Sequence, residues 1–397
     1  MKEGWKKQKL GEVLSIERGG SPRPIQKYLT KSIEGINWIK ISDATASDRY
    51  IYETKEKITK DGLHKTRVVN EGDFILSNSM SFGRPYIVKT TGCIHDGWLV
   101  LRQNGTKIFE TEFLYYLLSS QFVFQQFNSK AAGSTVRNLN ITLVSSVEVP
   151  IPPLPEQQRI VSIIDEAFEA IDKAIENTQK NLQNSKELFE SYLNNVFENG
   201  GEDWDAKRLG DVLVKTETVD PAKKPNQEFT YLDVSSVNKD TKEIENVTVL
   251  LGKDAPSRAR KLIRTNDVIF ATVRPTHIRV AVITREYNEQ VCSTGYFVLR
   301  AKEFLSNNFV FYFLLTSGYY EQMEKLQKGA SYPAVTDAEV KSIVIPFPSL
   351  DAQGTIIQKI EALNVETKNL ESTYQQKLRD LEELKKSILN KAFAGEL

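Results

Sequence analysis

The feature that most constrains the fold is an internal duplication with a spacing of about 200 residues. Motifs of the first half recur in the second half, in the same order and at offsets between 194 and 199 residues. The matched segments are Trp5, Leu10 and Gly11 with Trp204, Leu209 and Gly210; 71–77 with 265–271; 96–102 with 294–300; 113–118 with 309–314; and 147–160 with 343–356. Repetition at one spacing predicts two copies of the same structural unit.

Each copy ends in a long stretch with helical character. The first stretch runs from Pro155 to about Gly200 without an internal proline or glycine, and its counterpart runs from Asp351 to Gly395. Both show apolar residues at alternating spacings of three and four, which is the pattern of a coiled coil. The predicted seam positions are Val161, Ile164, Phe168, Ile171, Ile175, Thr178, Leu182, Ser185, Phe189, Tyr192 and Val196, and then Ile356, Ile360, Leu363, Thr367, Leu370, Tyr374, Lys377, Leu381, Leu384 and Ile388.

A helix of about 44 residues is roughly 65 Å long, so each stretch would project beyond a domain of ordinary size. Two surface helices that pack only on their own domains are the alternative, and this length argues against it. A whole block lies between the two stretches, which allows them to pair antiparallel within one chain. The polar seam residues Thr178, Ser185 and Lys377 either set the register or face a partner.

The remaining sequence forms two blocks of similar size, so we predict domains at 1–154 and 201–350 with long helices at 155–200 and 351–397. Short apolar and β-branched runs alternate with helical patterns in each block. We expect a short helix at the start of the chain, over 5–20, and one amphipathic helix near the end of each block. The predicted fold class is α+β, with two similar mixed α/β domains in a pseudo-two-fold arrangement, separated by two long antiparallel coiled-coil helices.

Composition limits the possible function classes. The net charge of the 397 residues is zero, but residues 155–200 hold nine acids and four bases, so the blocks carry a compensating positive excess. No apolar run reaches the roughly 20 residues of a membrane span, and no secretory signal follows Met1. Cys93 and Cys292 occupy equivalent places and are expected to be buried and free. We therefore expect a cytoplasmic protein without membrane association.

A search for catalytic motifs predicts no enzyme activity in the chain itself. Phosphate-binding glycine loops, GxSxG and the Asn/Asp-Pro-Pro-aromatic tetrapeptide of adenine methyltransferases are all absent. His64, His95 and His277 are scattered and have no partner at metal-ligand spacing. We predict no catalytic residue, no metal site and no cofactor in this chain.

Basic and polar loops between strands are the best candidates for binding chemistry. Residues 253–279 carry seven Lys or Arg and only two acids. Arginine forks match phosphate and the major-groove edge of guanine, whereas asparagine matches adenine. The predicted DNA contacts of the second block are Arg258, Arg260, Arg274, His277, Arg279, Ser331 and Tyr332; those of the first block are Asn78, Ser79, Arg84, Ser134, Thr135, Arg137 and Asn138.

The two copies share their framework motifs and differ in these loops. A duplicated scaffold with different polar loops is what a chain needs in order to recognise two different nucleic-acid sequences. For any single residue, an ordinary solvated loop remains an equally good interpretation.

The whole chain resembles the specificity subunit of a Type I restriction–modification system. The resemblance rests on the two block ends VEVPIPPLPEQQ and IVIPFPSLDAQG, on DFILSNSMSFGR, on GSTVRNLN and on the closing KKSILNKAFAGEL. The second block end departs from the pattern, with Ala352 where the first has Glu156.

The resemblance implies that each block recognises one half of a bipartite double-stranded DNA target. It implies that the helices set the gap between half-sites and dock two modification methyltransferase subunits, which bring S-adenosylmethionine. A restriction subunit with ATP and Mg²⁺ is a further expected partner. Two other hypotheses remain: a coiled-coil adaptor that holds two proteins without DNA specificity, and an enzyme fused to recognition blocks, against which the missing motifs argue.

Overall fold

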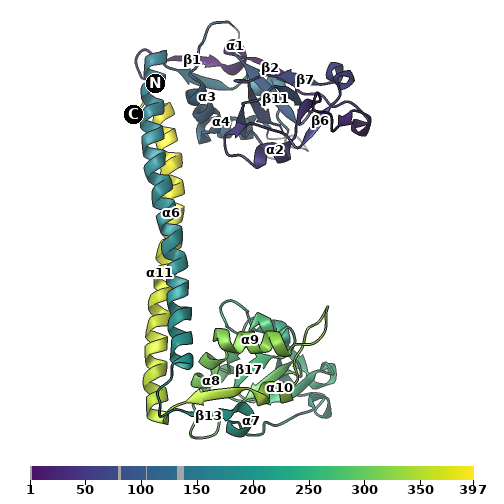
Figure 1. The fold of residues 1–397 in the computed structure, drawn as a ribbon, viewed down its shortest axis with the longest axis vertical. Coiled ribbons are helices and arrows are strands. Elements are labelled where there is room, and N and C mark those ends of the chain that lie inside the picture. Colours follow the sequence, from purple (N-terminus) through teal and green to yellow (C-terminus); the bar gives the residue numbers. More distant parts are fainter. Residues whose placement is uncertain (1, 79–81, 104, 132–137) are drawn as a thin grey trace. The chain divides into compact units, whose positions relative to one another are not determined.

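The computed structural model describes residues 2–78, 82–103, 105–131 and 138–397 (Figure 1). Its contacts divide the chain into two compact units, one of residues 1–178 with 376–397 and one of residues 179–375. Each unit holds one globular block and a part of both long helices. The predicted domain boundaries at 154, 200 and 350 stay a prediction.

The first unit is built from two five-stranded sheets, in the orders β2-β11-β8-β9-β5 and β3-β6-β4-β10-β7, and a two-stranded β1-β12 ribbon. Its strands are β1 Lys6–Lys9, β2 Ser15–Arg18, β3 Leu29–Thr30, β4 Ile36–Ile39, β5 Tyr50–Ile51, β6 Glu56–Ile58, β7 Arg67–Val69, β8 Phe74–Ser77, β9 Pro85–Val88, β10 Gly92–Ile94, β11 Trp98–Arg102 and β12 Glu148–Ile151. Its helices are α1 Leu10–Val13, α2 Ile41–Thr45, α3 Thr111–Ser119, α4 Gln121–Ala131 and α5 Ile141–Ser145, with the beginning of α6 and the end of α11.

The second unit repeats this plan with a four-stranded sheet β15-β14-β19-β16, a three-stranded sheet β18-β17-β20 and a β13-β21 ribbon. Its strands are β13 Asp205–Arg208, β14 Glu228–Leu232, β15 Thr248–Leu251, β16 Ala259–Ile263, β17 Val268–Ala271, β18 Val280–Val282, β19 Gln290–Ser293, β20 Tyr296–Leu299 and β21 Val344–Phe347. Its helices are α7 Leu209–Val212, α8 Asn307–Phe313, α9 Ser317–Leu326 and α10 Asp337–Ser342.

The central strands are apolar on both faces because each face packs against a different layer. On β8, Phe74 and Leu76 join the core with α3 and α4, whereas Ile75 joins the core shared with the second sheet. On β17, Phe270 faces α8 and α9, and Ile269 faces the four-stranded sheet. Successive strand residues point to opposite faces, so a strand between two layers has no polar side.

The predicted helix at the start of the chain is wrong for most of its length. Lys6–Lys9 is a strand, only Leu10–Val13 is helical, and Ser15–Arg18 is again a strand. The reason is long-range pairing: β1 lies antiparallel to β12, with Lys6 opposite Ile151. β13 pairs with β21 in the same way in the second unit.

Each predicted amphipathic helix near the end of a block is two helices. In the first unit Ser120 separates α3 from α4, and its hydroxyl oxygen accepts a hydrogen bond from the Val123 amide at 3.3 Å. In the second unit Thr316 caps α9 by accepting from the Tyr319 amide at 3.2 Å. A hydroxyl side chain that caps the new helix compensates for the break in the first one.

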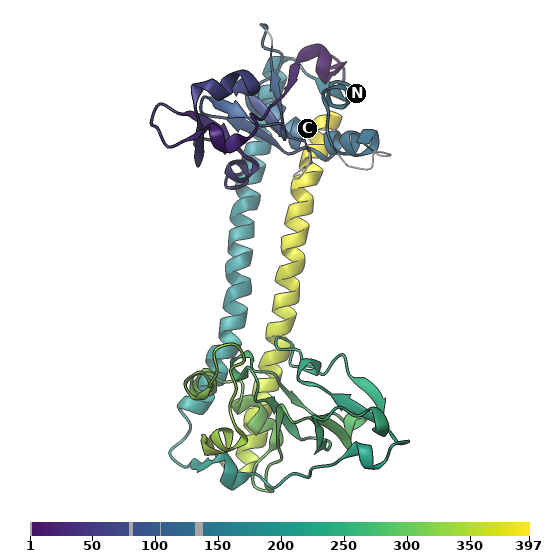
Figure 2. The same cartoon turned by 90° about the vertical axis from the view of Figure 1, so that its right-hand side faces the viewer.

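Both long helices are present and unbroken, as Figure 2 shows: α6 covers Leu154–Glu198 and α11 covers Leu350–Ala394, 45 residues each. Within the first unit they run antiparallel. Arg159 near the start of α6 donates to the carbonyl oxygen of Leu397 at 2.7 Å, and Asp172, between three and four turns later, forms an ion pair with Lys385. In the second unit, Leu193 of α6 and Ile360 of α11 belong to the same core cluster.

The seam predicted for α6 agrees with its burial, but three of the ten seam positions predicted for α11 are displaced by one residue. Ile360 and Thr367 are buried as expected. Leu370, Lys377 and Leu384 are exposed, and their neighbours Glu371, Leu378 and Lys385 are partly buried instead. The heptad period was therefore correct, and the phase of the alternate positions was wrong because leucine also occupies positions outside the seam.

The buried hydroxyls of the seam bond within their own helix. Thr178 donates to the Ala174 carbonyl oxygen at 2.6 Å, Ser185 to Asn181 at 2.7 Å, and Thr367 to Leu363 at 3.0 Å. This pattern satisfies the hydroxyl without a partner chain. Lys377, the third polar seam residue predicted, is exposed.

A buried glutamine fixes the start of each long helix to its block. The side chain of Gln157 accepts from the Glu110 amide at 2.8 Å and donates to the Ile108 and Pro152 carbonyl oxygens at 2.9 and 2.8 Å. The side chain of Gln353 makes the equivalent three bonds, to Ser306, Phe304 and Pro348. These bonds explain why the glutamine is common to both block ends.

Cys93 and Cys292 are buried and free, as expected from the sequence. Burial raises the pKa of Cys93 to about 11 and that of Cys292 to about 12. Among the helices in the described part of the chain, none combines the length and the apolar character that a membrane span needs.

Candidate nucleic-acid interface

An equivalent ion-pair network supports the strand before the first candidate loop of each block. In the first unit, Arg102 donates from Nη2 to Asp73 at 2.9 Å and from Nη1 to Glu17 at 3.0 Å. These carboxylates raise the pKa of Arg102 despite its partial burial. The start of β8, at the end opposite the loop, is therefore held by charge-assisted hydrogen bonds.

In the second unit Arg300 takes the place of Arg102. It donates from Nε and Nη2 to the two oxygens of Asp267, at 2.7 and 2.8 Å, and from Nη1 to Glu217 at 3.0 Å. The hydrogen bonds with Asp267 raise the pKa of Arg300. Because Asp267 is only 1% exposed, this pair is the more deeply buried of the two networks.

In the first unit, the loop after β8 lies beside the segment that leads into α5. The Asn78 carbonyl oxygen accepts from the Leu139 amide at 2.8 Å. The Asn78 side chain is only 2% exposed and donates from Nδ2 to the Asp96 carbonyl oxygen at 2.7 Å. Asn78 was proposed to recognise adenine, but its buried amide is already bonded, so in this structure it positions the loop.

Arg84, at the end of this loop, remains at the surface. Its guanidinium lies 5.2 Å from the centre of the Tyr86 ring and 3.7 Å from a carboxylate oxygen of Asp48. Gly83 precedes it with a φ of +77°, and a Cβ there would come within 2.9 Å of the Phe127 ring. Glycine is therefore required for the close approach of this loop to α4.

The other predicted contacts of the first block are only partly described. Ser79, Ser134, Thr135 and Arg137 lie outside the described residues. Asn138 is half-buried, and among the described residues its side-chain oxygen Oδ1 has no hydrogen-bond donor. Asn138 directly precedes Leu139, so it lies beside the loop of Asn78 and Arg84.

The second unit repeats this pairing of two loops. The Thr272 carbonyl oxygen accepts from the Val335 amide at 2.9 Å, as Asn78 does from Leu139. Two residues further, the Arg274 amide donates to the Pro333 carbonyl oxygen at 2.7 Å. The loop after β17 and the loop after α9 therefore form one surface.

Three predicted contacts of the second block come together there. Tyr332 is 72% exposed, and the guanidinium of Arg274 lies 5.3 Å from the centre of its ring. Ser331 is exposed beside Tyr332. An exposed aromatic ring next to an arginine suits both stacking on a base and contact with a phosphate.

His277 and Arg279 follow Arg274 in the same loop. Arg279 donates from Nη1 to the Val237 carbonyl oxygen. Burial lowers the pKa of His277, and the positive charges of Arg279, Arg274 and Lys239 lower it further. Three cationic side chains therefore lie close enough to His277 to act on it.

Arg258 and Arg260 lie on a different part of the second unit, at the edge strand β16. The Arg258 carbonyl oxygen accepts from the Thr294 amide at 2.8 Å, and its side chain is exposed. Arg260 lies 3.3 Å from a carboxylate oxygen of Asp220, so its charge is largely compensated. These two arginines therefore belong to the four-stranded sheet, whereas the group around Arg274 follows β17 of the three-stranded sheet.

Sequence reasoning missed two lysines of this surface. Lys239 and Lys242 lie in the hairpin 237–244, and Lys242 donates to the Ile278 carbonyl oxygen at 2.8 Å. Their sequence neighbours Asp240 and Glu243 hide the local excess of positive charge. Only the fold places the two lysines next to the loop of Arg274.

The described residues contain no group of three or more His, Cys, Asp or Glu side chains that could hold a metal ion. The absence of a cofactor from the chain stays a prediction.

The fold and the paired loops define a duplicated α/β protein with two long helices and two equivalent polar surfaces. A family model described as the Type I restriction modification DNA specificity domain matches residues 2–183 and again residues 201–380. The chain belongs to this family, and the family predicted from its motifs is confirmed. Relatives are specificity subunits of Type I systems, which are not catalytic themselves.

A relative and two solved structures show how far the likeness extends. The Type I restriction enzyme MjaVIII specificity subunit of Methanocaldococcus jannaschii is 22% identical over 427 residues, covering 100% of this chain and 93% of that protein. The HsdS subunit from Thermoanaerobacter tengcongensis has a TM-score of 0.65 at 21% identity, covering 100% and 98% of the two chains.

A chain from a structure on complex assembly and conformational transition of the type I R-M system has a TM-score of 0.78 at 21% identity. That alignment covers 100% of this chain and 99% of the other. These likenesses confirm the predicted fold class, two mixed α/β domains with two long helices.

Proposed function

We propose that this chain is the DNA-recognition subunit of a Type I restriction–modification complex and binds a bipartite double-stranded target, with one half-site for each block. The observation that carries the proposal is the equivalent pairing of two loops in each unit, through Asn78 with Leu139 and through Thr272 with Val335. Equal frameworks that present different side chains suit two half-sites of different sequence.

The proposed contacts are the surface residues of these loops. Among the described residues, the proposed contacts are Arg84 and Asn138 in the first block, and Arg274, His277, Arg279, Ser331 and Tyr332 in the second block. Ser79, Ser134, Thr135 and Arg137 complete the proposal for the first block. Arg258 is a further candidate on the edge of β16, and Arg260 a weaker one because of its ion pair with Asp220.

We propose that the long helices dock two modification methyltransferase subunits, which bind S-adenosylmethionine and methylate adenine. Exposed apolar side chains on the helices support a protein-binding role: Leu188 is 52% exposed and Val365 is 59% exposed. Leu370 and Leu384 also lie outside the seam and are exposed. Large apolar side chains exposed on one element are typical of a surface that binds another protein.

A restriction subunit that uses ATP and Mg²⁺ is a further proposed partner, and the cytoplasm is the proposed location. In this proposal the helices also set the number of base pairs between the half-sites.

A gel-shift series at several salt concentrations tests DNA specificity against the adaptor hypothesis. The chain is combined with its methyltransferase partners, and target DNA is compared with DNA of scrambled sequence. We expect a preference for the target that persists as salt weakens both complexes, because phosphate contacts depend on salt and base contacts supply the discrimination. Equal binding of both DNAs would support the adaptor and contradict the proposal.

Removal of four residues from both long helices tests the role of the helices. One turn is about 3.6 residues and 5.4 Å, so the proposal predicts an altered gap with both half-sites unchanged. A changed half-site sequence with an unchanged gap would show that the helices do not set the spacing.

A further inference from the structure

The loop of Arg274 has an unusual backbone. A 3₁₀ turn at Pro275–His277 is flanked by Arg274, with φ and ψ of 51° and 58°, and by Ile278, with 44° and 53°. Both residues are in the left-handed region, which is unfavourable for a residue with a Cβ by roughly 1–2 kcal/mol and rare for a β-branched one. Contacts outside the turn must therefore hold this conformation.

Those contacts come from the hairpin 237–244. The ammonium of Lys242 donates to the Ile278 carbonyl oxygen at 2.8 Å and also to the Lys239 carbonyl oxygen. In the opposite direction, Arg279 donates to the Val237 carbonyl oxygen. Two cationic side chains thus join the hairpin to the end of the strained turn.

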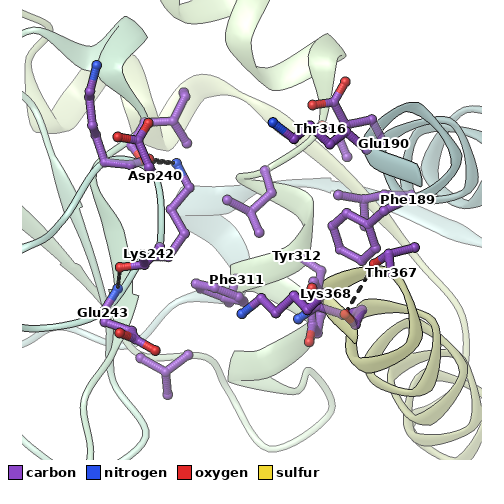
Figure 3. Close-up of a pocket in the computed structure, with 18 of the residues that line it drawn as sticks. Phe189, Glu190, Asp240, Lys242, Glu243, Phe311, Tyr312, Thr316, Thr367 and Lys368 are labelled. Atoms are coloured by element: carbon purple, nitrogen blue, oxygen red, sulfur yellow. Dashed lines mark hydrogen bonds between the residues drawn. The ribbon is translucent and has the colours of Figure 1, made fainter. Parts of the chain in front are cut away.

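The tip of the hairpin is not held from its other side. A cleft of about 1160 Å³ separates it from the long helices of the same unit. Figure 3 shows Asp240, Lys242 and Glu243 along one wall and Phe189 and Glu190 of α6 along the opposite wall. Only the base of the hairpin, at Val237 and Ile244, packs into a core cluster.

Several cationic side chains surround the turn, and Asp240 and Glu243 of the hairpin are acidic residues nearby. Among the described residues, Lys239, Lys242, Arg274, His277 and Arg279 form no ion pair with a carboxylate. Arg260, Lys261, Arg264 and Arg300 of the same unit each do. Burial lowers the pKa of Lys242 to about 8, with Arg279 and Lys239 adding to the decrease and Asp240 opposing it. Uncompensated cations grouped on one surface suit a polyanion.

We propose that the hairpin 237–244 is part of the DNA interface of the second block, with Lys239 as a phosphate contact and Lys242 as the positioning residue of the 274–279 turn. The assignment rests on the proposed DNA-binding function. The ammonium of Lys242 donates to two backbone carbonyl oxygens, so Lys242 affects DNA binding by holding the backbone of the turn in place. Lys239 is at the hairpin tip, and its carbonyl oxygen, not its side chain, takes part in that bonding.

The experiment uses the chain in complex with its methyltransferase subunits and a target defined by methylation mapping with the wild-type chain. Affinity is measured for the intact target and for targets with a base change in the first or the second half-site. The variants are Lys242→Met, which keeps the chain length without the donors, Lys242→Arg, which restores donors, Lys239→Gln, and the control Lys223→Gln at an exposed lysine outside both loops.

We expect Lys242→Met to lower discrimination at the second half-site about 10-fold, equivalent to about 1.4 kcal/mol. Discrimination at the first half-site stays unchanged, and Lys242→Arg recovers most of the loss. We expect Lys239→Gln to weaken binding to all sequences and to reduce the salt slope by about 1. Lys223→Gln behaves like the wild type.

A folding defect would reduce the active fraction and leave the ratio between intact and altered targets unchanged, so the ratio separates positioning from stability. Wild-type discrimination in Lys242→Met, or an unchanged salt slope in Lys239→Gln, would overturn the corresponding assignment. A wild-type complex without any sequence preference would instead contradict the proposed function itself.

Discussion

The two blocks share a framework and differ in the chemistry of the loops that it carries. Arg102 with Asp73 and Arg300 with Asp267 hold equivalent strands, and Gln157 and Gln353 fix equivalent helix starts. The loop of the first block has a single described arginine near an aspartate, whereas that of the second block gathers uncompensated cations. Under the proposed function, the framework determines where DNA is contacted, and the loops determine which bases are recognised.

The largest expected effect concerns the framework. Arg300→Met leaves Asp267 buried without its partner, and we expect a loss of about 3 kcal/mol in the free energy of unfolding. Arg102→Met is the matched variant, and because Asp73 is more exposed we expect a loss of about 1–2 kcal/mol. Urea unfolding of both variants measures the difference. Equal losses would show that the burial of the carboxylate does not decide the energetics.

The next effect concerns the loops. Arg274→Ala combined with Arg279→Ala removes two forks from the second block, and we expect affinity for the second half-site to fall by about 10- to 100-fold. Arg84→Ala in the first block removes a guanidinium close to Asp48, so a smaller loss is expected, confined to the first half-site. The gel-shift assay with single half-site changes distinguishes the two. Unchanged affinity and specificity in the double variant would contradict the contact surface.

The free energy of unfolding is also expected to depend on pH through Lys242, which lies in the second unit. The pKa of Lys242 is about 8 in the folded chain and returns to its ordinary value of 10.5 on unfolding. Between these values the unfolded state binds more protons than the folded state, so stability must rise with pH in this window. The difference in unfolding free energy between wild type and Lys242→Met should therefore increase from pH 8 to 10.5. Parallel curves for the two proteins would refute the shift.

The smallest effect on stability is expected for the exposed leucines of α11, of which each unit has one in the pair compared below. Leu370 in the second unit and Leu384 in the first are exposed on α11. Leu370→Ser and Leu384→Ser should each change the free energy of unfolding by less than about 0.5 kcal/mol, because neither side chain is in the seam. Both should weaken the complex with methyltransferase subunits, which co-purification measures. Wild-type assembly of both variants would exclude this face of α11 as the docking surface.

Sequence reasoning recovered the features that depend on local pattern and repetition. The duplication, the heptad period and the shared Asp73 and Asp267 were visible in the sequence, and the comparisons confirm the fold class. The helix predicted at the start of the chain failed because β1 pairs with β12, about 140 residues away. No local pattern contains that pairing.

The candidate site stays a prediction, and the structure changes the expected roles of single residues for a related reason. Asn78 is a residue type that suits contact with a base. In the structure its side chain is buried and donates to the carbonyl oxygen of Asp96, in a distant turn. From the sequence, Lys242 reads as an ordinary lysine of a solvated hairpin. In the structure its ammonium donates to the carbonyl oxygen of Ile278. Residue type predicted the chemistry of the loops, whereas only tertiary contacts separate positioning residues from surface residues.

Genome-wide mapping of adenine methylation, with and without the gene for this chain, tests the central claim most directly. The account predicts that one split motif, two short half-sites separated by a fixed gap, is methylated only when the gene is present. Loss of Arg274 and Arg279 should then degrade one half of that motif and leave the other intact. A methylation pattern that is the same in both strains, or a motif without a gap, would contradict recognition by two separate blocks.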